Sequence, residues 1–347
     1  MKICYFGIYD PGYSRNRVLL KGFKANGIKV VECRSVRSGI IKYLDLLLQY
    51  LKIKKDFDFL FVAFPGQTVM VLARFLTRKK IIFDAFTSFY DSAVNDRKTI
   101  KRKSFGARKL WWLDKISCCM ANLIITDTNE NIKYFSETFH VPKENFIRVF
   151  VGSDYDSIGS AKGKKERDYF LVHFHGTNIP LQGVEYIMGA AKLLEGENIK
   201  FNMIGTKIKN QHQDQDRKNI NFIDNVPYEN LGEYISGADV SLGIFGATDK
   251  AQRVIPNKVY EALAAGTAVI TGDTPATREL LTDGVNAIFC RMADPEDLAD
   301  KILRLRDDLF LRNLVAKKGY ELFINKLTHN IIVKNFIVTL KNNGWCS

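Results

Sequence analysis

The residues best suited to chemistry lie in one segment, PNKVYEALAAGTAVITGDTPATRE, which covers residues 256–279. Its pattern predicts a helix that starts at Pro256 and Asn257 and ends at Gly266, followed by a short buried strand and a turn. A carboxylate in that helix, Glu261, can accept hydrogen bonds from ribose hydroxyls. A loop at the carboxyl end of a buried strand is the usual nucleotide site of an α/β sheet. The segment therefore predicts a nucleotide-binding site.

The turn after the buried strand leads to another helix, which we expect to open at Arg278 and Glu279. Thr274, Pro275 and Ala276 precede that opening. Backbone amides at a helix start would suit a diphosphate or the hydroxyls of a sugar. A plain helix cap at Thr274 is the alternative interpretation.

The elements that must position this segment alternate between strands and helices along the chain. Short apolar runs indicate the strands, and longer runs with helical spacing of apolar residues indicate the helices. Such alternation predicts an α/β fold with parallel sheets covered on both faces. In the first half, we expect strands at residues 2–7, 28–33, 57–64, 80–84 and 123–127 and helices at residues 14–26, 40–51 and 129–139.

At 347 residues the chain is long enough for two domains with cores of their own. A polar and charged stretch, residues 153–168, predicts the linker between them. We therefore expect a first domain at residues 1–155, a second at residues 166–324 and a helical tail at residues 325–347. No stretch of about 18 apolar residues occurs, so no transmembrane helix is expected.

Positive charge is concentrated in the first half of the chain. Residues 1–155 hold 27 Lys and Arg residues against 14 Asp and Glu residues, whereas residues 156–347 hold 24 of each. The net charge of +13 therefore belongs to the first half, which indicates an anionic partner.

The densest basic segment, residues 98–115, also contains Trp111 and Trp112, and three lysines within residues 52–55 extend it. Basic side chains beside interfacial tryptophans are typical of proteins that bind an anionic membrane surface. A solvated helix with two core tryptophans is the alternative. Nucleic acid would attract the same charges, but no nucleic-acid-binding motif accompanies them, so no nucleic acid is expected as a partner.

The six cysteines are scattered, and none has the spacing of metal ligands. Free thiols indicate a reducing cytoplasm. The first ten residues read as a strand and a loop, without the charged, apolar and cleavage regions of a signal peptide. We therefore expect a cytoplasmic protein, either free or peripheral on the inner face of the cell membrane.

Two segments resemble the donor-binding domain of the retaining glycosyltransferases of the GT-B fold, most closely glycosyltransferase family 4. One is residues 256–279, and the other is residues 172–194, VHFHGTNIPLQGVEYIMGAAKLL, which resembles the first strand, glycine loop and first helix of that domain. The resemblance implies two Rossmann-like domains facing a cleft, with the tail at residues 325–347 packed on the first. It also implies transfer of a sugar from a nucleoside diphosphate sugar to a hydroxyl group, with retention at the anomeric carbon.

The resemblance also implies roles for individual residues of the second domain. Glu261 matches the second carboxylate of the family's Glu-x7-Glu motif, which holds the donor ribose, whereas Arg253 stands at the place of the first. Gln182 stands where the family commonly has a lysine. Either Arg253 or Lys258 would then steady the diphosphate, or the loop amides of Gly176 and Thr177 would do so. The alternative is that Arg253 and Lys258 are surface cations. The expected donor-binding residues are Gly176, Thr177, Gly205, Pro256, Asn257, Glu261, Thr274, Pro275 and Ala276.

In the first domain, the loop after the first strand contains Gly12, Tyr13 and Arg15, which we expect to contact phosphate and acceptor. Asp84 ends a strand and Asp91 follows it. Either carboxylate could orient the acceptor hydroxyl or take its proton, and a helix-capping role is the alternative for each. Arg253 and Lys258 complete the set of four expected catalytic residues.

A metal is not expected. His173 and His175 alternate, so both lie on one face of a strand, but no third ligand is spaced to join them. Asp214-Gln215-Asp216 and Asp56-Phe57-Asp58 match the Asp-x-Asp metal motif of another glycosyltransferase fold without its context, and we interpret both as chance. The sequence thus predicts a metal-independent reaction without a cofactor.

These observations lead to one expected function and two alternatives. The expected function is transfer of a hexose or an N-acetylhexosamine to a lipid-linked saccharide acceptor in the assembly of a surface polysaccharide or glycoconjugate. The first alternative is a GT-B nucleotide-sugar epimerase, which would turn over a nucleotide sugar without an acceptor. The second is a catalytically silent protein that binds a sugar nucleotide or a protein partner.

Overall fold

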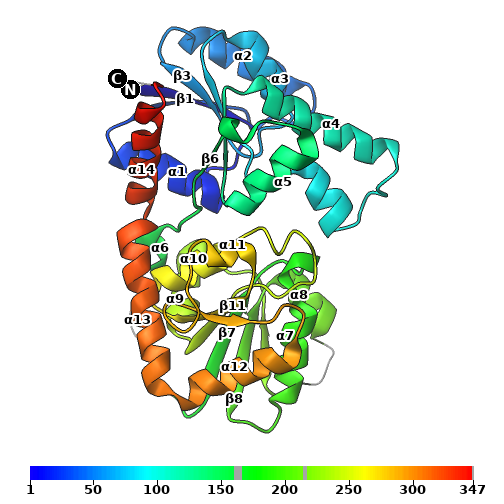
Figure 1. Ribbon diagram of the computed structural model, residues 1–347, viewed down its shortest axis with the longest axis vertical. Helices are drawn as coiled ribbons and strands as arrows, with labels where there is room; N and C mark the ends of the chain where they lie inside the picture. The colour runs from blue at the N-terminus through cyan, green and yellow to red at the C-terminus, as the bar shows by residue number, and fades with distance from the viewer. Residues whose placement is uncertain (160–165, 214–216, 346–347) are drawn as a thin grey trace. The chain divides into compact units, whose positions relative to one another are not determined.

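In the computed structural model the chain divides into two compact units, which comprise residues 1–151 with 329–347, and residues 152–328 (Figure 1). The structure describes residues 1–159, 166–213 and 217–345. Of the predicted linker at residues 153–168, residues 160–165 therefore lie outside the described part. The expected Asp-x-Asp match at residues 214–216 lies outside it as well.

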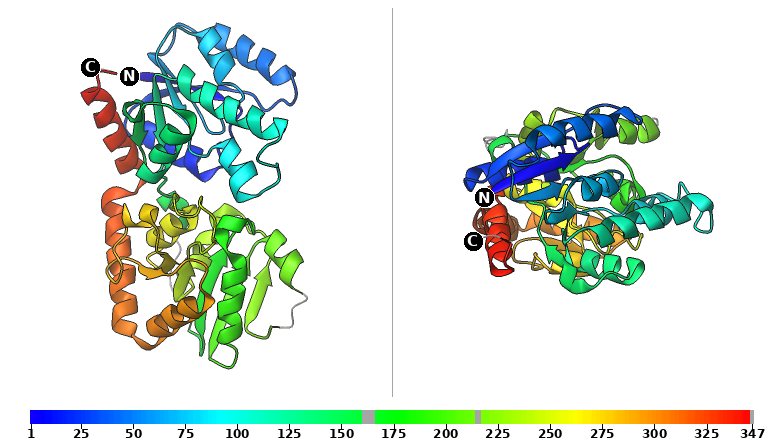
Figure 2. Two further views of the ribbon diagram at one scale, coloured as in Figure 1. Left: turned by 45° about the vertical axis from the view of Figure 1, so that its right-hand side comes forward. Right: turned by 90° about the horizontal axis from the view of Figure 1, so that it is seen from above.

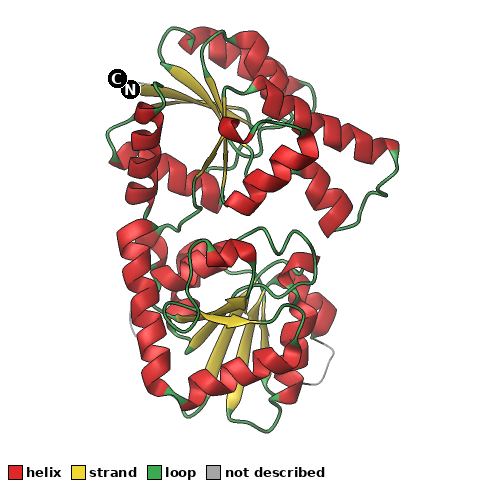
Figure 3. Ribbon diagram, viewed as in Figure 1, coloured by secondary structure: helices red, strands yellow, loops and turns green. Residues whose placement is uncertain are grey.

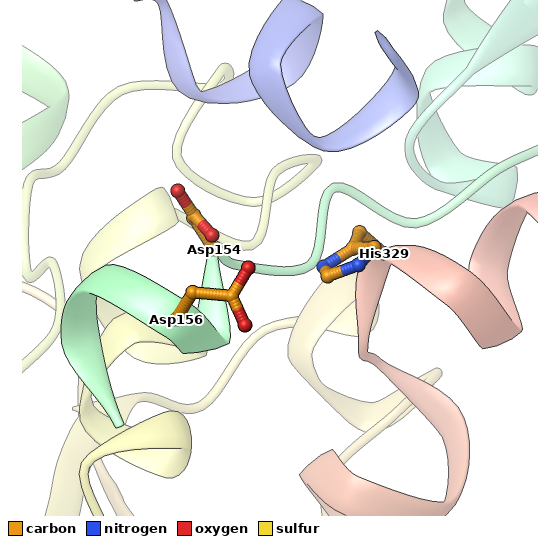
Figure 4. Close-up of side chains that lie close together, drawn as sticks. All are labelled: Asp154, Asp156 and His329. Atoms are coloured by element: carbon orange, nitrogen blue, oxygen red, sulfur yellow. The ribbon is translucent and has the colours of Figure 1, made fainter. Parts of the chain in front are cut away.

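The start of the predicted linker belongs to the second unit, because its residues pack there. Ser153 forms a parallel β-bridge with Thr328. Tyr155, the first residue of α6 (Tyr155–Ile158), stacks on Phe323 and shares a 2.7 Å hydrogen bond with the hydroxyl of Tyr320. Figure 4 labels Asp154 and Asp156, near the start of the second unit, and His329, the residue at which the chain returns to the first unit.

The first unit is built on a parallel sheet of six strands in the order β2-β1-β3-β4-β5-β6 (Figure 3). The α/β fold with a parallel sheet is therefore confirmed. The sheet adds a strand, β6, that the sequence analysis did not predict, because its three residues are too short for a periodic signal. The strands are β1 (Lys2–Gly7), β2 (Lys29–Arg34), β3 (Phe59–Val62), β4 (Ile81–Asp84), β5 (Leu123–Thr126) and β6 (Phe146–Arg148).

Helices cover both faces of this sheet. One apolar layer joins the sheet to α1 and α14, and a second joins it to α2, α3, α4 and α5. Gly22 of α1 lies against the His329 carbonyl and the Val333 side chain of α14, so only glycine allows the two helices to pack at this distance. The helices are α1 (Ser14–Ala25), α2 (Ile41–Ile53), α3 (Met70–Leu76), the π-helix η1 (Asp91–Asp96), α4 (Phe105–Met120), α5 (Asn129–Phe139), the 3-10 turn η2 (Lys143–Asn145) and α14 (His329–Asn342).

The second unit holds another parallel six-stranded sheet, in the order β12-β11-β10-β7-β8-β9 (Figure 2). Its core is one apolar cluster around Phe174, Phe201 and Ile270, all fully buried. The strands are β7 (Phe170–His175), β8 (Ile199–Ile204), β9 (Ile220–Ile223), β10 (Val240–Leu242), β11 (Ala268–Gly272) and β12 (Ile288–Cys290). The helices beyond α6 are η3 (Pro180–Gln182), α7 (Val184–Leu193), α8 (Thr206–His212), α9 (Tyr228–Ser236), α10 (Asn257–Ala264), α11 (Pro275–Arg278), α12 (Pro295–Asp307) and α13 (Leu309–Lys326).

The helix after β11 differs from its prediction. It does not open at Arg278 and Glu279, because α11 starts at Pro275 and Arg278 is its last residue. Thr274 caps it in a reciprocal capping box, in which the side chain of each of Thr274 and Thr277 accepts from the backbone N–H of the other. This cap sets the helix start one turn earlier than the charged residues suggested.

Candidate functional site

Glu261 lies on α10, a helix that is buried along almost its whole length. Pro256 precedes the helix in an extended conformation, and Gly266 follows it with φ 67°, the left-handed conformation that ends many helices. Every residue of α10 after Asn257 is buried. Because the small side chains of α10 allow close packing on the sheet and on α13, Glu261 is held at only 4% exposure.

Two histidines of β7 connect Glu261 to the sheet. His175 Nε2 lies 2.9 Å from Glu261 Oε2, and His173 Nε2 lies 2.9 Å from His175 Nδ1. The prediction that both histidines share one face of a strand is thus what the structure shows. Their spacing reflects a hydrogen-bonded chain that ends on a carboxylate.

The direction of the bond to Glu261 follows from the chemistry of the carboxylate. A carboxylate accepts, so His175 Nε2 carries the hydrogen of that bond. His173 is fully buried, and its Nδ1 has no hydrogen-bond partner among the described residues. Burial lowers the pKa of His173 well below its ordinary value, and His175 and Lys258 lower it further. His173 is therefore neutral at pH 7.

Lys258 places a cation one turn before Glu261 on the same helix. Its ammonium lies 4.8 Å from the centre of the Phe174 ring, and its side chain is 5% exposed. Burial lowers the pKa of Lys258 to about 8, although the charge of Glu261 opposes this shift. The ammonium is thus protonated at neutral pH but poorly solvated, so an anion that approached it would be attracted strongly.

The glycine loop after β7 differs from its predicted role. The amide of Gly176 donates to the Ile204 carbonyl, and the amides of Thr177 and Asn178 both donate to Gln182 Oε1 at 3.0 Å. These N–H groups therefore have partners within the chain, whereas the prediction required free donors for a diphosphate. Gln182, at the position where a lysine was expected, accepts both of these hydrogen bonds and so fixes the conformation of the loop.

Gly205, at the end of β8, supports the same loop by its lack of a side chain. Its φ is 152°, and a Cβ there would collide with the Gly176 carbonyl. The structure therefore gives Gly205 a packing role beside the predicted site.

The start of α11 is also occupied by internal hydrogen bonds. The Thr274 amide donates to Thr277 Oγ1, Pro275 has no N–H, and the Ala276 amide donates to the Gln252 carbonyl at 3.3 Å. The expected phosphate site at these three residues therefore lacks free amide donors. Arg253, Pro256 and Asn257 are half-buried and precede or begin α10.

In the first unit, Arg15 and Asp84 form an ion pair whose side chains are both 0% exposed. Arg15 Nε lies 3.0 Å from Asp84 Oδ2, and its Nη1 donates to the carbonyls of Val149 and Phe150. Burial raises the pKa of Asp84, and the Arg15 guanidinium opposes that rise. Both residues were expected to meet the substrate, but each is already engaged by the other inside the unit.

Asp127 lies close to this pair and is also buried. Its Oδ1 accepts from Asn131 at 2.6 Å, and burial raises its pKa to about 6, against the opposing effects of Asn131 and Arg15. Tyr13, in contrast, is 39% exposed, and it follows the exposed Gly12 in the loop before α1. Of the expected phosphate-loop residues, Gly12 and Tyr13 are thus accessible and Arg15 is not.

Asp114 organises the segment that contains Asp91, a role that the sequence analysis did not find. Its carboxylate accepts from the Ser88 hydroxyl and from the amides of Phe89 and Tyr90, and burial raises its pKa to about 6. Asp91 is 2% exposed and accepts from Asn95. The signal available in the sequence was an acidic residue on the otherwise apolar and basic helix α4.

A comparison with models of known protein families finds a match within the second unit. Residues 169–308 match the family model "Glycosyl transferases group 1". None of the curated proteins matches the sequence.

Several solved structures have the same fold at low sequence identity. HepE (Alr3699) of Anabaena, solved with UDP and glucose, is 13% identical and has a TM-score of 0.74, with 99% of this chain and 100% of that chain covered. Sucrose-phosphate synthase of Thermosynechococcus elongatus is 12% identical, with a TM-score of 0.75 and coverage of 99% and 98%. A TarM variant of S. aureus, solved with UDP and α-GlcNAc-glycerol among its ligands, is 16% identical, with a TM-score of 0.64 and coverage of 85% and 58%. Residues 169–308 are thus similar to the glycosyl transferases group 1, and the chain as a whole has the GT-B fold.

Proposed function

We propose that the chain transfers a sugar from a nucleoside diphosphate sugar and that Glu261 holds the donor ribose. The observation that carries this proposal is the carboxylate of Glu261, which is almost buried and fixed on one oxygen by a hydrogen bond from His175. Its second oxygen can accept a ribose hydroxyl. A UDP sugar is the first donor to test, because HepE and TarM were solved with UDP.

Lys258 and Arg253 are the cations that we propose for the diphosphate, in a reaction without a metal or cofactor. Negative charge builds on the leaving nucleoside diphosphate as the glycosidic bond breaks, and a poorly solvated ammonium stabilises it strongly. Lys258 lies one turn from Glu261 on α10, so one helix would position both contacts. The amides of Gly176 and Thr177 are engaged by Ile204 and Gln182, which leaves side-chain cations as the better candidates.

For the acceptor we propose a hydroxyl of a lipid-linked saccharide, in the assembly of a surface polysaccharide or glycoconjugate, with retention at the anomeric carbon. The support is the charge of the first unit, whose residues 1–151 and 329–347 hold 29 Lys and Arg residues against 13 Asp and Glu residues. Such a unit suits an anionic membrane surface. In the part of the chain that the structure describes, no helix has the length and apolar character needed to span a membrane.

The test is thermal stabilisation of the wild-type protein and of Glu261→Ala by UDP, GDP, CMP and their common sugar conjugates. A ligand at 100 times its dissociation constant stabilises the folded protein by about 2.7 kcal/mol, which is visible as a melting shift. We expect one nucleotide family to shift the wild-type protein and to lose most of its effect on Glu261→Ala. Glu233→Ala, at an exposed glutamate of the neighbouring helix α9, is the matched control and should keep the shift.

Turnover then separates transfer from the alternatives. The stabilising sugar nucleotide is incubated with and without a lipid-linked saccharide, and the products are identified by mass spectrometry. Acceptor-dependent glycosylation supports the proposal. A changed sugar nucleotide that forms without acceptor would instead support the epimerase alternative. Equal melting shifts for the wild-type protein and Glu261→Ala would show that Glu261 is not part of the donor site.

A further inference from the structure

Helix α2 carries apolar side chains on two opposite faces. Leu46 and Tyr50 are buried against the sheet of the first unit. On the outer side, Leu44, Leu48 and Leu51 are 57%, 61% and 49% exposed. A helix at the surface of a soluble unit normally has a polar outer face, so the outer leucines need a partner that is not part of this unit.

The exposed residues form a continuous stripe. Positions 44, 48 and 51 are four and three residues apart, which places them along one side of a helix. The stripe continues to the start of the helix, where Ile40 and Ile41 are 76% and 58% exposed. We call this set the α2 face: Ile40, Ile41, Leu44, Leu48 and Leu51. Single exposed aliphatic residues are ordinary on protein surfaces, whereas a stripe of five marks an interaction site.

The neighbouring helix adds to this surface. Helix α3 packs beside α2 in the same layer of the unit, and its Phe75 is 82% exposed (Figures 1 and 2). Helix α4 adds Phe105 and Trp112, at 82% and 50% exposure. Trp111 is committed to internal packing, since its indole donates to the Thr138 carbonyl. Large apolar side chains are therefore exposed on three helices of this layer, α2, α3 and α4.

The charges around the α2 face favour one kind of partner. Arg37, Lys52, Lys54 and Lys55 are exposed at its two ends. The one acidic residue within α2, Asp45, is engaged by Gln49, and hydrogen bonds from Ser35 and Gln49 lower its pKa. In a dimer formed through this face, the positive charges of the two copies would repel each other. An anionic lipid surface instead attracts these charges, and it accepts aliphatic side chains beneath its headgroups.

We propose that the α2 face inserts into the interfacial layer of an anionic bilayer, with the lysines at its C-terminal end on the lipid phosphates. The proposal rests on the proposed lipid-linked acceptor for its biological purpose, but its physical basis is the exposed stripe itself. It moves the main membrane contact from the tryptophans of α4, where the sequence pointed, to the leucines of α2. Insertion would hold the first unit at the surface where such an acceptor is found.

The test is co-sedimentation of the full-length protein with vesicles of phosphatidylcholine containing phosphatidylglycerol, and with vesicles of phosphatidylcholine alone. We expect binding to the anionic vesicles that falls at least tenfold in Leu44→Gln/Leu48→Gln. Leu309→Gln/Phe310→Gln is the matched control, because these residues of α13 are 56% and 78% exposed and belong to the second unit. The control should bind as the wild-type protein does.

A second variant tests the charges. Lys52→Gln/Lys54→Gln/Lys55→Gln should weaken binding to anionic vesicles and reduce its dependence on salt concentration. Wild-type protein that does not sediment with anionic vesicles, or a leucine variant that sediments as well as the control, would overturn the proposal. The proposal would also be overturned if sedimentation velocity showed a dimer for the wild-type protein and a monomer for Leu44→Gln/Leu48→Gln. The stripe would then be the contact with a second copy of the chain.

The result is separable from the proposed donor site. Stabilisation by UDP is measured on the same variants, and Leu44→Gln/Leu48→Gln should keep the wild-type shift, which also shows that the variant is folded. Vesicle binding without any nucleotide-induced melting shift would support the membrane role of the α2 face and contradict the proposed donor site. A nucleotide-induced shift without vesicle binding would support the donor site and contradict the membrane role.

Discussion

His175 Nε2 donates a hydrogen bond to Glu261 Oε2 over 2.9 Å, which joins the end of β7 to the middle of α10 across 86 positions of sequence. Behind His175, His173 Nε2 lies 2.9 Å from His175 Nδ1. This second hydrogen bond fixes the rotamer of His175 and thereby the plane of the carboxylate. A carboxylate held in this way needs little reordering when a ribose hydroxyl arrives.

His175→Phe should weaken nucleotide binding by about 10- to 150-fold, because a hydrogen bond to a charged group contributes about 1.5–3 kcal/mol. His175→Gln, whose side-chain amide can still donate, should recover part of the affinity. Calorimetric titration with UDP and with its dideoxyribose analogue checks the mechanism. The preference for UDP should shrink in His175→Phe, and an unchanged preference would mean that His175 does not act through Glu261.

Lys258→Met should make the second unit more stable at pH 7. The pKa of Lys258 is about 8 in the folded protein against an ordinary 10.5, so the unfolded chain binds this proton more tightly. Stability is therefore lost as the pH falls from about 10.5 to about 8, and the full loss is present below pH 8. Removing the buried charge should add about 1–3 kcal/mol to the free energy of unfolding. Differential scanning calorimetry at pH 7 and pH 10 measures the gain, which should be smaller at pH 10.

The same lysine should make nucleotide binding depend on pH. The protonated ammonium attracts a diphosphate, so the affinity for UDP should fall as the pH rises through about 8 in the wild-type protein. Lys258→Met should bind UDP at least tenfold more weakly at pH 7 and should lack this decline. A variant that is both more stable and equally tight in binding would show that Lys258 is a packing residue alone.

Asp84→Asn should destabilise the first unit by about 3–5 kcal/mol, because it leaves the Arg15 charge buried without its partner. Arg15→Met/Asp84→Leu should recover much of this loss. All three tryptophans of the chain, Trp111, Trp112 and Trp345, lie in the first unit, so urea unfolding followed by tryptophan fluorescence reports on that unit. Glu144→Gln, at an exposed position of η2, is the control. A stable Asp84→Asn protein that lacks transfer activity would restore Asp84 as a catalytic candidate.

Asp127→Asn should stabilise the first unit at pH 7 and leave it unchanged near pH 4. The pKa of Asp127 is about 6 in the folded protein and 3.8 for an ordinary aspartate, so its contribution to stability is complete below pH 4 and is lost as the pH rises through 6. The variant removes this loss, a gain of about 1–3 kcal/mol. Tryptophan-monitored urea unfolding between pH 4 and pH 8 checks it, and parallel profiles for the two proteins would contradict it.

The sequence alone determined the elements that local spacing encodes. The helix at Asn257–Ala264, the strand at Ala268–Gly272 and the alternation that builds two parallel sheets all follow from apolar periodicity and glycine stops. The start of α11 was misplaced, because the capping box of Thr274 and Thr277 is a weaker local signal than the charged pair that follows it.

Only the tertiary structure decided which distant side chains meet. Sequence spacing places Glu261 on a helix and His175 on a strand, but their hydrogen bond depends on the packing of α10 against the sheet. The same holds for Gln182, which takes the amides of its own loop, and for Arg15, which Asp84 neutralises inside the first unit. Helix α2 is apolar on two faces, and its sequence does not say which of them the sheet covers. That choice, made by packing, leaves the leucine stripe exposed.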